Sequence, residues 1–264
     1  MNMCGKINII EWNIHGAAGY GNHSIPFFVS DWIMNNNIHI AILTEFVIGS
    51  GWDYLKGSLE KEYNLYISPY VSNSNQCLIA IKKNVGFDLA NAKAITEMNT
   101  GEEEKPNFLQ VEVVYNSSTI NIIGTRIRNS RNQKEWQALD EHLTSQKDEV
   151  VICMGDFNAY WSNKDGCFWR KSKNKTLPKT SFMYELETPK WDIKNNGFSY
   201  VLPNGNCINV DSLIYKGISS VQDIKYNWQF INSKNGYGNM TPRDQKSHLI
   251  GLPDHAILYG SIII

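Results

Sequence analysis

Short apolar segments with the composition of β-strands recur along the whole chain, and they restrict its fold more than any other feature. Some of them alternate apolar and polar residues, as strands with one solvent-exposed face do. Others, such as IHIAILTEF, are apolar nearly throughout, as strands covered on both faces are. The segments cover residues 6–12, 38–45, 64–68, 76–82, 107–115, 119–126, 149–154, 198–202, 207–215 and 255–263.

Helical signals are fewer. Ser24 and Pro26 suit the N-cap and the first turn of a helix, which the sequence predicts over residues 24–37. Residues 131–146 repeat apolar side chains at helical spacing, and residues 51–62 form a weaker helix candidate.

Many strands with few helices favour sheets that pack on each other with helices outside. The chain has 264 residues and shows no repeat, low-complexity tract or linker. We therefore expect one α/β domain over residues 1–264.

Composition argues against several classes of protein. No apolar run approaches the roughly 18–20 residues that a membrane helix needs. The five cysteines form no CxxC pair, which disfavours a disulfide framework or a zinc site and favours a reducing compartment. The first residues lack a secretory apolar region and resemble a first strand. We expect a cytoplasmic protein without membrane contact, and a monomer; its net charge of -1 means that a local basic patch must meet any nucleic acid.

Two long polar segments, residues 160–181 and 232–253, have no clear strand or helix pattern and resemble functional loops. The first mixes basic and aromatic side chains, which suits a surface that follows a nucleic-acid backbone and stacks on bases. Aromatic side chains packed on the domain would explain the same composition, so both interpretations stay open. The candidate substrate contacts in this segment are Trp169, Lys171, Lys173 and Lys175.

Acidic, amide and histidine side chains stand where apolar segments stop or start. In α/β folds, strand ends at one edge of a sheet converge on a ligand site. Carboxylates with an asparagine and a histidine form a hard-oxygen site suited to magnesium, beside a proton-transfer group. Taken singly, Asp and Asn after a strand are also common turn formers. The residues in these positions are Asn13, Glu45, Asp156, Asn158, Asp211, Asp254 and His255.

The remaining histidines have ordinary explanations. His15 and His39 suit surface or core positions, and we expect His142 on a solvated helix face.

The order of these polar strand ends resembles the endonuclease/exonuclease/phosphatase superfamily, which includes pancreatic deoxyribonuclease and abasic-site endonucleases. The resemblance covers nearly the whole chain and ends near its C-terminus. GDFN is the most specific of the motifs that carry it. The motifs are WNIHG at 12–16, LTEF at 43–46, GDFNA at 155–159, NVDSLIY at 209–215 and PDHAIL at 253–258.

The resemblance implies a four-layered α/β sandwich, in which two mainly antiparallel sheets are flanked by helices. It also implies a role for each strand-end residue. Glu45 would be the principal ligand of Mg²⁺ or Mn²⁺, with Asn13 and Asp254 close enough to assist. Asp156 would orient or deprotonate the attacking water.

Three further roles follow from the same resemblance. Asn158 would hold the phosphate or the water. His255 would bind phosphate or act as a general base, with Asp211 as the residue that orients it.

Two positions depart from the family pattern. Where the family commonly has a histidine or tyrosine at the end of a central strand, this chain has Arg126, followed by Arg128 and Asn129. Arginine binds phosphate bidentately but cannot both donate and accept a proton as histidine does. The alternative for both arginines is a structural ion pair. The serine that precedes the closing Asp-His in the family is Pro253 here.

The favoured function is a divalent-metal-dependent phosphodiesterase, a nuclease acting on DNA or RNA. A phosphoesterase for small molecules or phosphoinositides is the first alternative, because fold alone does not determine the substrate. A catalytically silent relative that only binds nucleic acid is the second alternative.

Overall fold

The computed structural model describes residues 5–14, 25–70, 75–128, 132–146, 150–162, 167–170, 175–176, 185–187, 189, 194–202, 204–232 and 253–264. For residues 132, 160–162, 167–170, 175–176, 185–187 and 232, only the backbone is described.

The first sheet has six strands and one parallel pair, β1 with β2; its other neighbours are antiparallel. The strand order is β16 (Ser220–Asn227), β17 (Ile257–Ile263), β1 (Lys6–Asn13), β2 (Ile40–Phe46), β4 (Gln76–Lys82) and β3 (Tyr63–Ile67).

The second sheet repeats this plan, with six strands and one parallel pair, β7 with β8. The strand order is β12 (Glu185–Glu187), β15 (Asp211–Lys216), β8 (Val150–Asp156), β7 (Ser118–Arg126), β6 (Asn107–Tyr115) and β5 (Phe87–Ile95).

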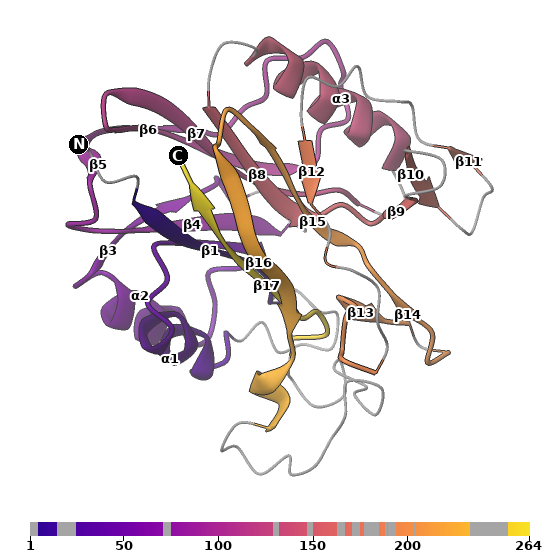
Figure 1. The fold of residues 1–264 in the computed structure, drawn as a ribbon, viewed down its shortest axis with the longest axis horizontal. Coiled ribbons are helices and arrows are strands. Elements are labelled where there is room, and N and C mark those ends of the chain that lie inside the picture. Colours follow the sequence, from indigo (N-terminus) through magenta and orange to yellow (C-terminus); the bar gives the residue numbers. More distant parts are fainter. Residues whose placement is uncertain are drawn as a thin grey trace.

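Helices cover the outer faces of the two sheets (Figure 1). α1 (Phe28–Asn35) and α2 (Trp52–Leu59) flank the first sheet, and α3 (Asn132–Ser145) flanks the second. The predicted four-layered α/β sandwich is therefore confirmed. No helix in the described ranges is long and apolar enough to cross a membrane.

Smaller elements lie outside the two sheets. They are the hairpin β13 (Tyr200–Val201) with β14 (Cys207–Ile208), the small sheet of β9 (Tyr160–Ser162), β10 (Cys167–Arg170) and β11 (Lys175–Thr176), and the 3-10 helix η2 (Gln229–Asn232).

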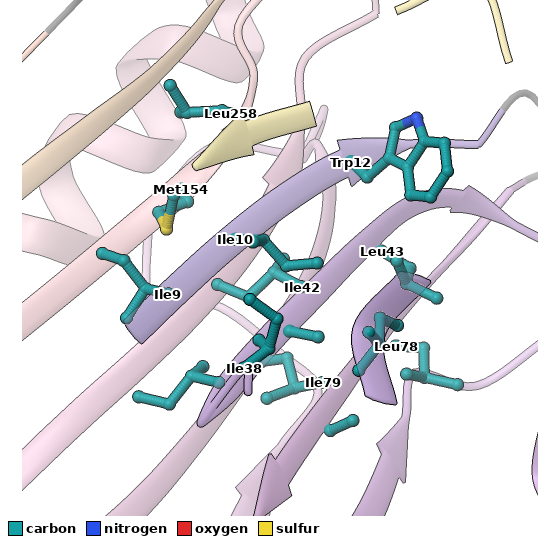
Figure 2. Packing of buried hydrophobic residues seen from close by; sticks show 14 of the residues in the cluster. Ile9, Ile10, Trp12, Ile38, Ile42, Leu43, Leu78, Ile79, Met154 and Leu258 are labelled. Atoms are coloured by element: carbon teal, nitrogen blue, oxygen red, sulfur yellow. The ribbon is translucent and has the colours of Figure 1, made fainter. Parts of the chain in front are cut away.

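The main hydrophobic core fills the space between the sheets and extends to α1 and α2. Figure 2 shows part of it, around Ile9, Ile42 and Ile79 of the first sheet and Met154 of the second. The sheets approach closely at Gly124 of β7, where a Cβ atom would lie 2.7 Å from Cγ2 of Ile42. A side chain at Gly124 would therefore push the sheets apart.

A second, smaller core lies between α3 and the outer face of the second sheet. Trp136, Leu139 and Leu143 of α3 pack there against Val151 and Cys153 of β8. The predicted apolar face of this helix is confirmed.

Several sequence predictions need correction. β5 and β16 were missed because their exposed, polar residues hide the strand pattern. The segment 207–215 forms two strands, β14 and β15, rather than one. The first helix starts at Phe28 rather than at Ser24, which lies outside the described residues.

The prediction for His142 was wrong. Its side chain is only 2% exposed and packs edge-on against Phe108 of β6. The helix face that carries it is therefore the face that covers the sheet.

Candidate active site

Three charged residues stand side by side on neighbouring strands of the second sheet. Arg126 at the end of β7 is in register with Asp156 at the end of β8, and Asp156 is in register with Asp211 at the start of β15. β7 and β8 are parallel, so their carboxyl ends meet at the same edge. Asp211 reaches this edge because β15 runs the opposite way.

Glycine is required at the position before Asp156. A Cβ atom on Gly155 would lie 1.8 Å from the backbone oxygen of Thr125 in the neighbouring strand. The GDFN motif therefore contains a packing residue as well as polar ones.

Asn13, at the end of β1 in the first sheet, contacts the same edge of the second sheet. Its Nδ2 donates a hydrogen bond to Oδ2 of Asp156 at 3.1 Å and lies 3.4 Å from Nε2 of His255. Asn13 ends β1, so one amide connects the ends of strands from both sheets with the histidine before β17.

Glu45 is held in an uncommon backbone conformation at the end of β2. Its φ is 49°, in the left-handed region, and the pairing of β2 with β4 shifts register between Leu43 and Phe46. Such a conformation costs about 1–2 kcal/mol for a residue other than glycine. Glu45 lies within this irregularity of the pairing and is 7% exposed.

Asn158 has the same left-handed conformation, with a φ of 48°. Its Nδ2 donates to the backbone oxygen of Ile127 at 2.7 Å and to Oδ2 of Asp156 at 3.1 Å. Its backbone N–H donates to Oδ1 of Asp156 at 2.9 Å. The turn after β8 therefore holds the Asp156 carboxylate in one orientation.

His255 and Asp211 form a buried pair. Nδ1 of His255 lies 2.9 Å from Oδ2 of Asp211, and the two side chains are 7% and 0% exposed. Trp12 donates from Nε1 to the backbone oxygen of His255 at 3.2 Å, and Tyr226 donates from its hydroxyl to the backbone oxygen of Asp211 at 2.6 Å. Both backbones are thus tied to the core, and Nε2 of the imidazole is directed toward Asn13.

Arg126 links the two sheets by ion pairs. Its Nη2 lies 2.5 Å from Oε1 of Glu45, and its Nε lies 3.7 Å from Oδ2 of Asp156. Its side chain is 21% exposed, against 8% for Glu45 and 2% for Asp156. The Arg126 side chain is therefore more exposed than either carboxylate with which it pairs.

Burial and crowding of charge alter the acidities at this edge. Burial raises the pKa of Asp156 to about 7, with further contributions from the nearby Asp211 and Glu45, although His255 and Arg126 act to lower it. Burial, the largest single influence, acts to lower the pKa of His255, but Asp211, Asp156 and Asp254 together outweigh it and hold this pKa well above the ordinary value. The carboxylates that crowd this edge of the second sheet contribute to both raised pKa values.

These residues fit a divalent cation with oxygen ligands. Asp156, Asp211 and His255 each offer a ligand atom, and these atoms lie within 4.8 Å of one another. Glu45, Asn13 and Asp254 add oxygen donors at the same edge, and hard oxygens are what Mg²⁺ and Mn²⁺ prefer. Oδ1 of Asp254 lies 4.0 Å from Nε2 of His255. The predicted ligand and catalytic residues are therefore neighbours in space.

Two residues of this region were not singled out from the sequence. Glu11 of β1 is fully buried; its Oε1 accepts a hydrogen bond from Oγ1 of Thr44 at 2.7 Å. Burial, followed by the nearby Asp211, raises the pKa of Glu11 well above the ordinary value. A glutamate inside an apolar strand was the available signal, because a buried carboxyl group needs a partner.

Tyr200 of β13 is the second residue of this region that was not predicted from the sequence. Its ring lies on the imidazole of His255, with centroids 4.7 Å apart and planes 32° apart, and the two residues form an isolated β-bridge. Burial, followed by Asp254, Asp156 and Glu45, raises the pKa of Tyr200 to about 12, so its hydroxyl stays protonated. Nothing local in the sequence pairs it with a residue so far along the chain.

The predicted substrate contacts are only partly described. Arg128 is held by two partners. Its Nε donates to Oε1 of Glu135 in α3 at 2.5 Å, and its Nη2 donates to the backbone oxygen of Lys105 at 3.0 Å. This arrangement matches the structural alternative for that arginine. Asn129, Lys171 and Lys173, and the side chains of Trp169 and Lys175, lie outside the described residues.

Comparison with known proteins gives a consistent family and fold. The sequence profile of the Endonuclease/Exonuclease/phosphatase family matches residues 10–245. None of the curated proteins matches the sequence.

Solved structures resemble this one over nearly the whole chain. Truncated Caenorhabditis elegans TDP2 has a TM-score of 0.66 and 15% identity, with 98% of each chain covered. TDP2 of D. rerio, complexed with single strand DNA product, has a TM-score of 0.62 and 13% identity, covering 98% of this chain and 100% of its own. ANGEL2, a 2',3'-cyclic phosphatase, has a TM-score of 0.66 and 12% identity, covering 97% and 95%. At these identities the likeness is one of fold.

Proposed function

Because this chain belongs to the endonuclease/exonuclease/phosphatase family, we propose that it is a divalent-metal-dependent phosphodiester hydrolase acting on DNA or RNA. The observation that carries the proposal is the row Arg126, Asp156 and Asp211 on three neighbouring strands, facing Asn13 and His255. Cations, carboxylates and an imidazole at one rigid strand edge are the groups that phosphodiester hydrolysis requires.

Glu45 is the principal ligand of the cation in this proposal, with Asn13 and Asp254 beside it. When bound, a magnesium or manganese ion supplies positive charge for the non-bridging and leaving oxygens, on which negative charge develops. The irregularity at Glu45 supports this role, because strained backbone persists mainly where the surrounding structure enforces it, commonly at functional sites.

Asp156 positions the attacking water and receives its proton. Hydrogen bonds from Asn13 and Asn158 hold both carboxylate oxygens, so the water binds in one orientation. Positioning of this kind supplies a large part of the rate of such reactions. Water attacks phosphorus, its proton passes to Asp156, the bond to the leaving oxygen breaks, and the leaving oxygen takes up a proton from solvent.

His255 binds a phosphate oxygen through Nε2. Asp211 accepts the hydrogen bond from Nδ1, which keeps the imidazole in one orientation and supports its positive charge. Arg126 provides a second cation for phosphate, in the position where the family commonly has histidine or tyrosine.

Two observations favour nucleic acid as the substrate. The D. rerio TDP2 structure of the same fold holds a single-stranded DNA product. The segment 160–181 of this chain carries basic and aromatic residues, as backbone-following and base-stacking surfaces do.

A second candidate is a cyclic phosphodiester. ANGEL2, which matches the fold equally well, is a 2',3'-cyclic phosphatase. The same catalytic residues would serve that substrate, since the bond cleaved is also a phosphodiester.

The decisive experiment is a substrate panel with magnesium. We expect cleavage of plasmid DNA or single-stranded RNA, together with bis-nitrophenyl phosphate, and no cleavage in excess chelator or by Asp156→Asn. Preference for RNA ending in a 2',3'-cyclic phosphate would favour the second candidate. Hydrolysis of nitrophenyl phosphate alone would indicate a phosphomonoesterase, and full activity in chelator would exclude the metal-dependent mechanism.

A salt titration separates nucleic acid from small diesters. Replacing Lys171, Lys173 and Lys175 with alanine should flatten the dependence of DNA or RNA binding on salt by up to about three phosphate equivalents. Hydrolysis of bis-nitrophenyl phosphate by the same variant should remain unchanged. Trp169→Ala should weaken single-strand binding by about 1–3 kcal/mol if its ring stacks on a base. An unchanged salt slope would remove segment 160–181 from the substrate surface.

A further inference from the structure

Arg126 has an unusual set of neighbours for a phosphate-binding arginine, because carboxylates surround it. Besides its ion pairs with Glu45 and Asp156, its charge is stabilised by the more distant Glu135 and Asp254, and together they raise its pKa although burial opposes this. In the structure it therefore acts as a counter-ion for the acidic edge.

The carboxylate that Arg126 holds most closely is Glu45, the residue proposed as the principal metal ligand. A guanidinium and a divalent cation that share one carboxylate in a partly buried site repel each other strongly, because screening by water is weak there. Cation binding at Glu45 is thus in competition with the Arg126–Glu45 ion pair.

Arg126 is not fully engaged in its present position. Its Nε is buried and makes no hydrogen bond within the part of the chain that the structure describes, since Asp156 Oδ2 lies beyond hydrogen-bond distance at 3.7 Å. Its contacts are therefore geometrically incomplete. A phosphate group, by contrast, can accept two parallel hydrogen bonds from the guanidinium fork.

Arg128, two residues along the chain, differs from Arg126 because its guanidinium makes hydrogen bonds to two partners. Its Nε and its backbone N–H both bond to Glu135, at 2.5 and 2.6 Å, and its Nη2 donates to the backbone oxygen of Lys105. Among the described residues, Arg126 makes its one close ion pair with Glu45, and its side chain is 21% exposed.

We propose that Arg126 exchanges Glu45 for a substrate phosphate when the site is loaded, so that the divalent cation and the phosphodiester bind with positive coupling. The exchange leaves the guanidinium paired in both states and frees Glu45 only when a phosphate replaces it. Neither ligand alone then reaches its full affinity. This inference rests on one part of the proposed function, the assignment of Glu45 to the cation and of Arg126 to the phosphate, and not on hydrolysis itself.

Manganese binding measured by electron paramagnetic resonance or calorimetry tests the exchange without any turnover. The probe for the anion is dimethyl phosphate, which has the charge of a phosphodiester. For the natural protein we expect dimethyl phosphate to tighten manganese binding at least about fivefold, within the usual range of coupling between two sites.

Arg126→Gln should bind manganese about tenfold more tightly than the natural protein without the anion, and dimethyl phosphate should no longer tighten it. Arg126→Lys retains the charge and a partner for Glu45 but lacks the fork, so it should bind manganese like the natural protein and show weaker coupling. Lys93→Gln removes an exposed charge on β5 and should behave like the natural protein in both measurements. Thermal melting verifies that each variant is folded.

Coupling of equal size in Arg126→Gln and in the natural protein would overturn the exchange, as would unchanged manganese affinity in that variant. If Arg126→Gln did not fold, full coupling in Arg126→Lys would overturn it instead. The proposed function is tested separately by the substrate panel. Manganese coupling without hydrolysis of any diester would reject that function and leave the exchange standing.

Discussion

Two buried histidines lie in polar clusters on opposite faces of the second sheet, and their surroundings differ in kind. His255, 6% exposed, lies on the face toward the first sheet, next to Asp211 and Asp156. His142, 2% exposed, lies on the outer face under α3. Burial acts on both rings to disfavour the charged form, so the neighbours decide the charge.

The groups that lie within hydrogen-bond distance of the His142 ring are neutral. Its Nε2 lies 2.7 Å from Oε1 of Gln110, and its Nδ1 accepts a hydrogen bond from the backbone N–H of Asn99 at 3.3 Å. The amides of Gln110, Asn121 and Gln146 bond to one another beyond it. Burial, followed by the charge of Lys105, lowers the pKa of His142 to about 4. The hydrogen-bonding side chains around His142 are therefore uncharged amides, and among the described residues no carboxylate supports a charge on its ring.

Around His255 the neighbours are charged. Carboxylates raise its pKa, and the ring is tied to Asp211 on one side and faces Asn13 on the other. Charges are retained here at the cost of burying them, which is characteristic of a site that acts on a ligand. Burial of a histidine therefore does not by itself determine its charge; the charge of the neighbouring groups does.

The largest expected effect tests the functional side of this comparison. His255→Gln and Asp156→Asn should each lower the turnover of bis-nitrophenyl phosphate about a thousandfold, while the thermal midpoint stays close to that of the natural protein. The double variant should lose less than the product of the single losses, because the groups act as a unit. His142→Gln is the matched control, with turnover preserved. Multiplicative losses, or unfolding of either single variant, would contradict a shared catalytic role.

The structural side is tested by the pH dependence of stability. The pKa of His142 is lower in the folded protein than its ordinary value of 6.5, so the unfolded chain binds the proton first. The stability that this group contributes is therefore fully present above about pH 6.5 and is lost as the pH falls toward about 4. At about pH 5, the free energy of unfolding has fallen by about 2 kcal/mol on account of His142.

Urea unfolding at about pH 7.5 and about pH 5 measures this loss. His142→Gln has no proton to bind and should lose about 2 kcal/mol less between these pH values than the natural protein. An identical pH dependence in both proteins would show that the His142 cluster does not exclude the proton.

The smallest expected effect on turnover concerns Tyr200, whose ring packs on the imidazole of His255. Tyr200→Leu removes the ring that lies on the imidazole and should lower turnover by about two- to tenfold, because such ring pairs contribute about 0.5–1.5 kcal/mol. Tyr200→Phe keeps the ring and should retain most of the activity. Steady-state kinetics separate the two variants. Equal damage in both would instead assign a role in the reaction to the Tyr200 hydroxyl.

Much of the fold was accessible from the sequence because strands and helices bury apolar side chains with fixed periods. The apolar segments 6–12, 76–82, 107–115 and 119–126 became β1, β4, β6 and β7 with small shifts at their ends. β5 and β16 were not predicted because they are edge strands. Their polar side chains face solvent, so the two-residue alternation of apolar and polar residues is lost.

For the site, the sequence supplied the polar residues at strand ends, and the structure brings Asn13, Glu45, Asp156, Asp211 and His255 together at one edge. Their catalytic roles stay predictions. Tyr200 was missed because its bridge to His255 joins segments far apart in the chain. Glu11 was missed although its signal, a carboxylate in an apolar strand, was visible.

Local composition and residue order were enough to predict most of the strands, the polar residues that end them and the family that the chain resembles. The partners of each polar group, by contrast, depend on three-dimensional packing. It placed Arg126 on Glu45, Arg128 on Glu135, and His142 among amides rather than in solvent. The physical reason is that sheet register and the packing of α3 bring distant residues within bonding distance, and the charge of a buried group follows from those neighbours.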